Sequence, residues 1–279
     1  LIAQHNNGVL MDTARGRAAG ARLIRRVKAT AYAVVEQLRR GEFSISGTEV
    51  EFGTGKRYPE LILELPGGGR YILSGRIDRI DSCTSDSGER FVRVIDYKSK
   101  SGSAFDCADI ADGKRLQLPL YIAAIEAAGA AERAAGMYYL PVHEGIINSN
   151  GKEDDFGARI LKEFRLRGAC LNDAKLIELG GGEDVQPTAR SGWRLSEEQL
   201  KGTVNFAVDK ARQTACKIAK GHAEAYPLMS KENKTECEWC DYNSVCGFDA
   251  TLPCCKYRRA SIIKKDDFLE EVSHAQMDR

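Results

Sequence analysis

The sequence has no long apolar run and almost no net charge. No stretch approaches the roughly 18 uninterrupted apolar residues that a membrane-spanning helix needs. The 41 Lys and Arg residues nearly balance the 40 Asp and Glu residues, so overall charge gives no reason to expect nucleic-acid binding. We therefore expect a globular chain without membrane contact, and any binding to DNA has to come from a local patch.

The nine cysteines are unevenly distributed. Four are scattered, whereas the others crowd into the last fifth of the chain, at Cys237, Cys240, Cys246, Cys254 and Cys255. The 279 residues are 43% hydrophobic, which is enough for one large packed domain or two small ones without disulfides. The clustering favours an intracellular metal or cluster site over an extracellular disulfide framework, and we expect a cytoplasmic location.

Hydrophobic periodicity divides the chain into four parts. The first, 1–45, contains a helical pattern over 13–40, and we expect it to be truncated upstream because the chain begins at Leu1 in mid-pattern. The others are a core over 46–236, a cysteine-rich segment over 237–250 and a charged tail over 251–279. We expect the tail to pack against parts of a longer protein.

Within the core, period-two patterns predict strands and helical spacing predicts helices. Ser196 and Gln199 match a capping box, which predicts that a helix begins there. The segment 153–182 has no pattern that we can assign. The predicted elements are a hairpin over 61–75 with a glycine turn at 66–69, antiparallel strands over 70–80 and 91–98, a helix over 113–128 that starts near Leu116, and a strand over 136–142.

Two predicted strands carry acids inside apolar runs. In RVIDYKSKSG (93–102), side-chain alternation places Asp96 and Lys98 on one face, and in SGRIDRID (74–81) it places Asp78 toward the same site if the strands pair. An exposed edge strand with a weak surface ion pair is the simpler explanation of a lone Asp-x-Lys. Two converging carboxylates beside an ammonium group cost several kcal/mol, however, and a divalent cation such as magnesium or manganese offsets that cost.

The resulting pattern resembles the PD-(D/E)XK nucleases. Asp78 matches their first acid, and Asp96-Tyr97-Lys98 matches their Asp-x-Lys. In LQLPLY, Gln117 and Tyr121 resemble the Q-x-x-x-Y motif of the RecB-like branch, where they support the active site. The resemblance implies a restriction-endonuclease-like α/β fold, with a mixed central sheet flanked by helices. It also implies a magnesium ion held by the two acids and the carbonyl of Tyr97, with Lys98 assisting the attacking water.

A further acid and a missing histidine bear on this site. Glu49, in TEVEFG, sits where similar proteins have a Glu two residues before Phe-Gly, and it is a candidate for another acid near the metal; a strand-end surface carboxylate is the alternative. The RecB-like pattern also has a helical His before the first acid. Only His5 precedes Asp78, in a context that does not match.

The motif CEWCDYNSVC spaces Cys237, Cys240 and Cys246 as C-x2-C-x5-C, which suits zinc or an iron–sulfur cluster. It resembles the C-terminal part of the 4Fe-4S staple found in the AddB component of AddAB-type helicase–nucleases and in RecB-like nucleases of CRISPR adaptation. In both, the fourth cysteine precedes the nuclease core. Here no cysteine precedes Cys83, and Cys254 or Cys255 is the alternative.

Of the two relatives, AddB fits more of the chain, and it implies a DNA exonuclease that processes double-strand breaks with an AddA-like helicase partner. Two other classes stay open. One is a catalytically incomplete module that binds DNA or a partner. The other is a zinc-stabilised interaction domain in which the cysteines carry the function.

The predicted N-terminal helix also carries a basic run. Arg22, Arg25, Arg26 and Lys28 decorate it, among apolar residues at helical spacing. Such a run is usually a solvated face, and contact with DNA is the alternative.

Overall fold

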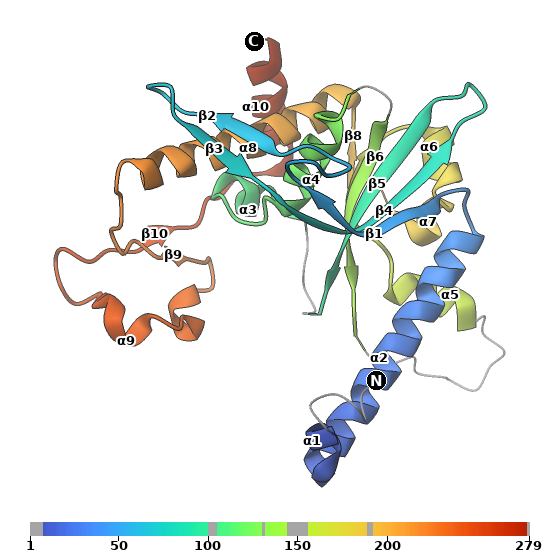
Figure 1. Cartoon of the computed structure of the whole chain (residues 1–279), viewed down its shortest axis with the longest axis horizontal. Coiled ribbons are helices and arrows are strands. Elements are labelled where there is room, and N and C mark those ends of the chain that lie inside the picture. The colour runs from blue at the N-terminus through green and yellow to red at the C-terminus, as the bar shows by residue number, and fades with distance from the viewer. Residues whose placement is uncertain (1–7, 100–104, 130–131, 144–155, 189–191, 278–279) are drawn as a thin grey trace.

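Strands from all parts of the core assemble into one six-stranded sheet, in the order β1-β4-β5-β6-β7-β8 (Figure 1). The computed structural model describes residues 8–99, 105–129, 132–143, 156–188 and 192–277. The sheet strands are β1 (Ser44–Phe52), β4 (Gly75–Thr84), β5 (Arg90–Lys98), β6 (Arg133–Pro141), β7 (Arg167–Leu171) and β8 (Trp193–Leu195).

The sheet is mixed, as predicted. β4 runs antiparallel to both β1 and β5, which confirms the predicted pairing of the two strands that carry acids. The pairs β5–β6 and β7–β8 are parallel, and β6–β7 is antiparallel. Helices cover the sheet, so the expected α/β architecture with a mixed central sheet is correct.

The predicted hairpin is also present. β2 (Leu61–Glu64) pairs with β3 (Arg70–Leu73) in antiparallel register, and Leu61 and Leu63 point inward while Ile62 is exposed. The turn between them needs left-handed backbone at Gly67 (φ 96°) and Gly68 (φ 85°), which glycine adopts without steric cost.

Each face of the sheet has its own core and its own helices. On one face, Val92 and Val94 of β5 pack with Leu118 of α4 and Leu200 of α8. On the other, Ile95 packs with a cluster that includes Ala33 of α2 and residues of α5. The helices are α1 (Val9–Asp12), α2 (Ala14–Arg39), α3 (Cys107–Ala111), α4 (Gln117–Glu126), α5 (Phe156–Glu163), α6 (Ala174–Leu179), α7 (Gly182–Val185), α8 (Glu197–Ala219), α9 (Asn243–Cys246), α10 (Lys265–Met277) and the 3-10 helix η2 (Glu236–Trp239).

Two helix starts follow from local hydrogen bonds. The Ser196 side chain accepts from the Gln199 N–H, and the Gln199 side chain accepts from the Ser196 N–H, so the predicted capping box is confirmed. The Thr13 side chain accepts from the Gly16 N–H at the start of α2.

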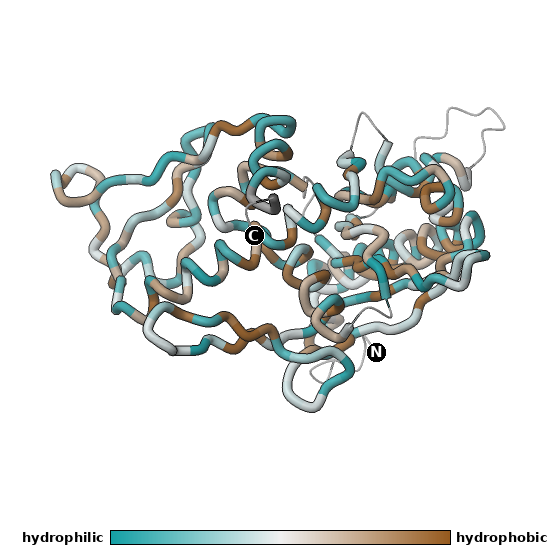
Figure 2. The backbone as a smooth tube through the Cα atoms, turned by 90° about the horizontal axis from the view of Figure 1, so that it is seen from above, coloured by the Kyte–Doolittle hydropathy of each residue, from teal (hydrophilic) through white to brown (hydrophobic). Residues whose placement is uncertain are grey.

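No helix among the described residues is long and apolar enough to cross a membrane, and Figure 2 shows hydrophilic and hydrophobic positions alternating along the chain.

Two segments differ from expectation. The unassigned stretch 153–182 contains the helices α5 and α6 with the sheet strand β7 between them. In the tail, α10 packs against α8 and buries Phe268, Leu269 and Val272, so this helix is part of the core, whereas 251–262 is largely exposed. The charged residues of α10 occupy the solvent-facing side of the same helix.

The cysteine-rich residues lie in a small lobe between α8 and α10, drawn in orange in Figure 1. A short parallel pair, β9 (Leu228–Met229) and β10 (Arg258–Arg259), closes its base. η2 and α9 lie between these strands, and Glu236 of η2 forms an ion pair with Lys114 of the main body at 3.3 Å.

Candidate active site

The acids of the predicted site meet on adjacent strands. Arg79 of β4 pairs with Ile95 of β5, and Asp78 and Asp96 are the next residues at this end of the ladder. The carboxylate of Asp78 accepts a hydrogen bond from the backbone N–H of Tyr97 at 2.9 Å. The pairing therefore brings Asp78 beside the Asp-x-Lys segment, as strand alternation predicts.

Asp96 occupies a buried position with one cationic neighbour. Its residue is 3% exposed, and Oδ2 lies 2.6 Å from the Lys98 ammonium nitrogen. The contact is a close ion pair whose angles fall outside hydrogen-bond geometry, and no other donor among the described residues reaches this oxygen. Burial raises the pKa of Asp96 above its usual value, the nearby Lys98 lowers it, and the charge of Asp78 raises it further.

Lys98 is held from the side by the start of α4. Its ammonium nitrogen donates to Gln117 Oε1 at 3.0 Å, and Gln117 Nε2 lies 3.5 Å from the Tyr121 hydroxyl. Gln117 and Tyr121 are four residues apart on one helical face, so a single turn of α4 positions both. Pro119 is accepted in this turn because the N–H groups there have no helical partner.

Tyr121 is close to all three acids of the site. It is 8% exposed, and burial raises its pKa to about 12. The charges of Asp96, Asp78 and Glu49 add to this shift in that order. The phenol therefore stays protonated at neutral pH and can donate a hydrogen bond at the site.

Glu49 lies on β1, the strand next to Asp78. The pairs Thr48 with Arg79 and Val50 with Ile77 place Glu49 opposite Asp78. Glu49 has a left-handed backbone (φ 52°), which is uncommon for a residue other than glycine, and its carboxylate forms an ion pair with Arg76 Nε at 2.7 Å. It is exposed, so it can exchange this partner without a large desolvation cost.

These residues fit a divalent cation in part. Carboxylate oxygens are suitable ligands for magnesium, and the buried carboxylate of Asp96, whose one close cationic partner is Lys98 in the described part of the chain, is an acceptor that a cation could use. Within the described residues, however, no three side chains of the His, Cys, Asp and Glu types converge tightly enough to hold a metal ion. A site here needs backbone carbonyls, such as that of Tyr97, and water to complete its shell. His5 lies outside the described residues.

The three predicted cluster cysteines do not converge in the described structure. Cys237 is in η2 and Cys246 in α9, with Cys240 between them, and Cys240 and Cys246 are exposed. The sulfur atoms of Cys254 and Cys255 lie 3.9 Å apart elsewhere in the lobe. The iron–sulfur assignment therefore stays a prediction from spacing.

Tyr139 belongs to the site although no motif in the sequence indicates it. This residue of β6 pairs in register with Asp96, is 1% exposed, and has a hydroxyl without a hydrogen-bond partner among the described residues. The Lys98 ammonium nitrogen lies 5.3 Å from the centre of its ring, within range of a cation–π interaction. The strand GMYYLPV was predicted, but its register against β5 cannot be read from sequence.

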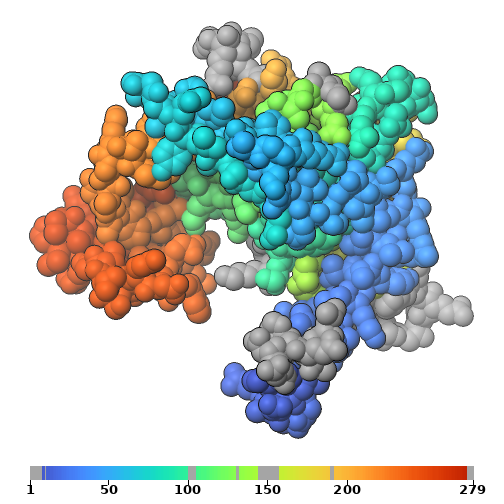
Figure 3. Space-filling view, viewed as in Figure 1, coloured from blue at the N-terminus to red at the C-terminus, as the bar shows by residue number. Residues whose placement is uncertain are grey.

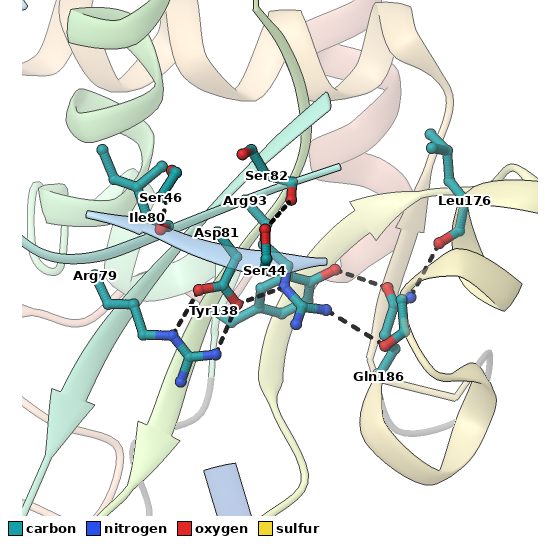
Figure 4. Close-up of polar contacts among 11 residues, drawn as sticks. Ser44, Ser46, Arg79, Ile80, Asp81, Ser82, Arg93, Tyr138, Leu176 and Gln186 are labelled. Atoms are coloured by element: carbon teal, nitrogen blue, oxygen red, sulfur yellow. Dashed lines mark hydrogen bonds and ion pairs between the residues drawn. The ribbon is translucent and has the colours of Figure 1, made fainter. Parts of the chain in front are cut away.

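A second cluster that the sequence does not reveal lies on the other face of the same strands (Figure 4). Asp81 accepts from Arg79 (2.6 and 2.7 Å) and from Arg93 (3.0 Å), and all three residues are at most 2% exposed. Nearby, the Tyr138 hydroxyl donates to Gln186 Oε1 at 2.8 Å. Two guanidinium groups thus share one carboxylate beneath the strands that carry Asp78 and Asp96.

Known proteins resemble the chain over most of its length. A family model described as the PD-(D/E)XK nuclease superfamily matches residues 6–247. Three relatives are each described as the B-type component of an ATP-dependent helicase/deoxyribonuclease. They come from Moorella thermoacetica (34% identical, 83% of this chain), Acetivibrio thermocellus (30%, 83%) and Alkaliphilus metalliredigens (26%, 98%). The chain spans 22 to 25% of the length of these relatives. These matches confirm the resemblance that the motifs indicate.

Proposed function

Because the chain belongs to the PD-(D/E)XK nuclease superfamily, we propose that it hydrolyses phosphodiester bonds in DNA with the help of a divalent cation, magnesium or manganese. One observation carries the proposal. Asp96 is buried, Lys98 forms an ion pair with it at 2.6 Å, and Asp78 adjoins it on the next strand. A buried carboxylate with a second, half-buried carboxylate nearby is costly unless the pair serves a ligand.

Asp78, Asp96 and the carbonyl of Tyr97 would hold the cation, with Glu49 as a further ligand once it leaves Arg76. A bound cation polarises the phosphate and lowers the pKa of water. The hydrogen bond from the Tyr97 N–H fixes the Asp78 carboxylate toward the site.

Lys98 and α4 supply the remaining chemistry. The Lys98 ammonium can hold the attacking water and offset charge that develops on the phosphate. Gln117 takes up one of its three hydrogens and so fixes its direction. Tyr121, protonated at neutral pH, can donate to a phosphate oxygen.

Substitution of Lys98 and Asp96 tests the proposal. We expect Lys98→Gln to lower the cleavage rate about 10²- to 10⁴-fold, the usual range for a positioned proton-transfer group. Asp96→Ala should abolish cleavage and also weaken Mn²⁺ binding measured by calorimetry. Lys217→Gln, on the exposed end of α8, is the matched control. Undiminished cutting by both site variants would refute the assignment.

The relatives suggest a larger setting. Because they are described as components of an ATP-dependent helicase/deoxyribonuclease, we propose that this chain acts in a helicase–nuclease complex with an AddA-like partner. There it would process DNA ends during double-strand-break repair, and the cytoplasmic location expected from the sequence stays a prediction. This setting accounts for the relatives better than CRISPR adaptation does.

Reconstitution with the helicase partner tests this setting. The complex that carries Asp96→Ala should unwind a duplex at the normal rate but leave one product strand uncut. Failure of the full-length protein to associate with that partner would contradict the proposed assembly, while cleavage by the chain alone would remain possible.

We also propose that Cys237, Cys240 and Cys246 bind an iron–sulfur cluster in the intact protein, on the strength of their spacing. Anaerobic purification should yield iron, sulfide and visible absorbance, and Cys240→Ser should remove them. Cys216→Ser, on α8 outside the motif, should retain them. Zinc in place of iron would favour a zinc-stabilised interaction domain.

A module that binds DNA without cutting it is the second candidate. The lack of a three-ligand cluster among the described residues favours it. A magnesium titration separates the two candidates: binding to DNA with no hydrolysis at any magnesium concentration, in the full-length protein, would support the binding module.

A further inference from the structure

The first long helix of the chain concentrates positive charge. Between Thr13 and Val35 the sequence has six Arg and Lys residues and no Asp or Glu, in a chain whose formal net charge is +1. The six are Arg15, Arg17, Arg22, Arg25, Arg26 and Lys28. All of them lie in the first two thirds of α2. The rest of the chain is therefore acidic overall, and the charge of α2 is a local feature.

α2 is anchored at one end. In its C-terminal third, Ala33 is fully buried and Gln37 donates from Nε2 to the Phe164 carbonyl at 2.8 Å. Before Thr30, Gly20 is the one residue of α2 that is buried, in a region where the short helix α1 packs against α2. The basic part of the helix thus projects as an arm, defined as residues 14–28.

The arm projects on the side of the molecule where β5 and β6 end. Figure 1 shows the lower half of α2 extending beyond the ends of these strands, and Figure 3 shows it standing clear of the body. β5 ends at Lys98 and β6 at Pro141, so this side also carries Asp96 and Lys98. α2 covers the face of the sheet opposite to the site, so a DNA strand that contacts both the arm and the site has to pass around this end of the sheet.

The length of the arm suits a nucleic-acid strand. From Arg15 to Lys28 the helix rises about 20 Å, which is the length of about six phosphates along one strand of a duplex. Arg15, Arg22 and Lys28 are exposed along that length. We propose that this arm binds the sugar–phosphate backbone of DNA and guides it toward Asp96 and Lys98. The identity of the ligand rests on the proposed nuclease function.

An acidic protein is the rival ligand. Leu23 and Val27 are also exposed on the arm, at 46% and 56%, and exposed apolar residues often mark protein contacts. DNA is favoured because no acid interrupts the charge and because the arm projects from the same end of the sheet that carries the candidate phosphodiester site.

A salt titration of DNA binding tests the proposal. The full chain with Arg15→Gln, Arg22→Gln and Lys28→Gln is compared with wild type by fluorescence anisotropy on labelled duplex and single-stranded oligonucleotides, with a chelator present. Each lost phosphate contact lowers the slope of log K against log [salt] by about 0.7 to 0.9. We expect the triple variant to lower the slope by about two to three and the affinity at low salt by at least about tenfold.

A charge-matched control separates the arm from general electrostatics. Lys217→Gln, Lys220→Gln and Lys264→Gln remove the same charge from exposed positions on and near α8 and α10, and should leave the slope unchanged. Equal effects of the two triple variants, or unchanged binding by the arm variant, would overturn the proposal, and the latter would point to an acidic protein partner. Because binding is measured without a divalent cation, a chain that binds through the arm but never cuts would refute the nuclease function alone.

Discussion

Asp81 and Asp96 are buried carboxylates on neighbouring strands, but their surroundings are opposite in charge. Asp81 lies between two guanidinium groups, those of Arg79 and Arg93. Asp96 has one ammonium neighbour, Lys98, and a second carboxylate, Asp78, nearby. The change from aspartate to asparagine should therefore shift stability in different directions at the two positions.

For Asp96→Asn we expect a rise in the free energy of unfolding at neutral pH, measured by urea denaturation with a chelator present. The pKa of Asp96 is raised by burial above 3.8, so ionisation disfavours the folded state as pH rises through that value. The difference from wild type should be greatest at neutral pH and vanish as pH falls below 3.8. A stability loss at neutral pH would contradict this account.

For Asp81→Asn we expect the free energy of unfolding to fall by about 3 to 5 kcal/mol, because two buried arginines lose their countercharge. Arg79 Nη1 has no hydrogen-bond partner among the described residues even in the wild type. Thermal melts of Asp81→Asn and Asp96→Asn, run side by side, compare the two faces of the sheet. Equal melting temperatures would show that the paired arginines do not depend on Asp81.

Two substitutions of Tyr139 distinguish the contribution of its ring from that of its hydroxyl. Tyr139→Phe keeps the ring under Lys98 and removes a buried hydroxyl without a partner in the described part of the chain, so we expect stability to rise by about 1 kcal/mol with cleavage nearly unchanged. Tyr139→Leu loses the ring face and should lower the cleavage rate. A marked loss of cleavage in Tyr139→Phe would instead assign the hydroxyl a role with the substrate.

At the scale of elements, α8 and α10 approach closely at Gly202. A methyl group there would lie 2.6 Å from the backbone oxygen of Val272, which cannot yield as a flexible side chain can. We expect Gly202→Ala to lower the free energy of unfolding by about 1 to 3 kcal/mol, as overpacking does. Gln213→Ala, on the exposed side of α8, should change it by less than about 0.5 kcal/mol. Denaturant midpoints of the two variants give the comparison.

Elements with strong local signals could be predicted from the sequence. The capping box at Ser196, the glycine turn between β2 and β3 and the alternation in β4 and β5 each act over a few residues. α5, β7 and α6 could not, since they are short and depend on packing against the rest of the core. The packing of α10 was not predicted because Phe268, Leu269 and Val272 are few among many charged neighbours.

The residues of the candidate site divide in the same way into those that short motifs predict and those that depend on tertiary structure. Asp78, Asp96, Lys98, Gln117 and Tyr121 lie in short motifs whose spacing alone places them on one face of a strand or helix. Tyr139 and the Arg79–Asp81–Arg93 cluster depend on the register between strands and on which face is buried. Sequence patterns leave both undetermined until the strands are paired.

At the scale of the whole molecule, the helices near the two ends of the chain differ in what they contribute. α10 adds buried apolar side chains to the core, whereas the first part of α2 carries charge and little of the core. Removal of 264–279 exposes the apolar partners of Phe268, Leu269 and Val272, among them Trp193 and Phe206. Each buried side chain of this kind contributes about 1.5 to 3 kcal/mol, and the sum is comparable to the total stability of a domain. We expect this truncation to unfold the chain, as circular dichroism would show, and a cooperative melt near the wild-type temperature would contradict it.

Removal of 1–26 should leave the fold intact. The contacts that anchor α2, through Thr30, Ala33 and Gln37, all lie beyond the cut, and the arm carries charge but little of the core. We therefore expect a melting temperature within a few degrees of wild type. Affinity for DNA should nevertheless fall at least as far as in the triple arm variant, because five of the six cationic side chains of the arm are gone and only Lys28 remains. Loss of folding would show that the arm is part of the core. Full DNA affinity in a folded truncated chain would place the DNA-binding surface elsewhere. The two outcomes can be told apart because the anchoring contacts of α2 lie beyond the cut, whereas most of the arm lies before it.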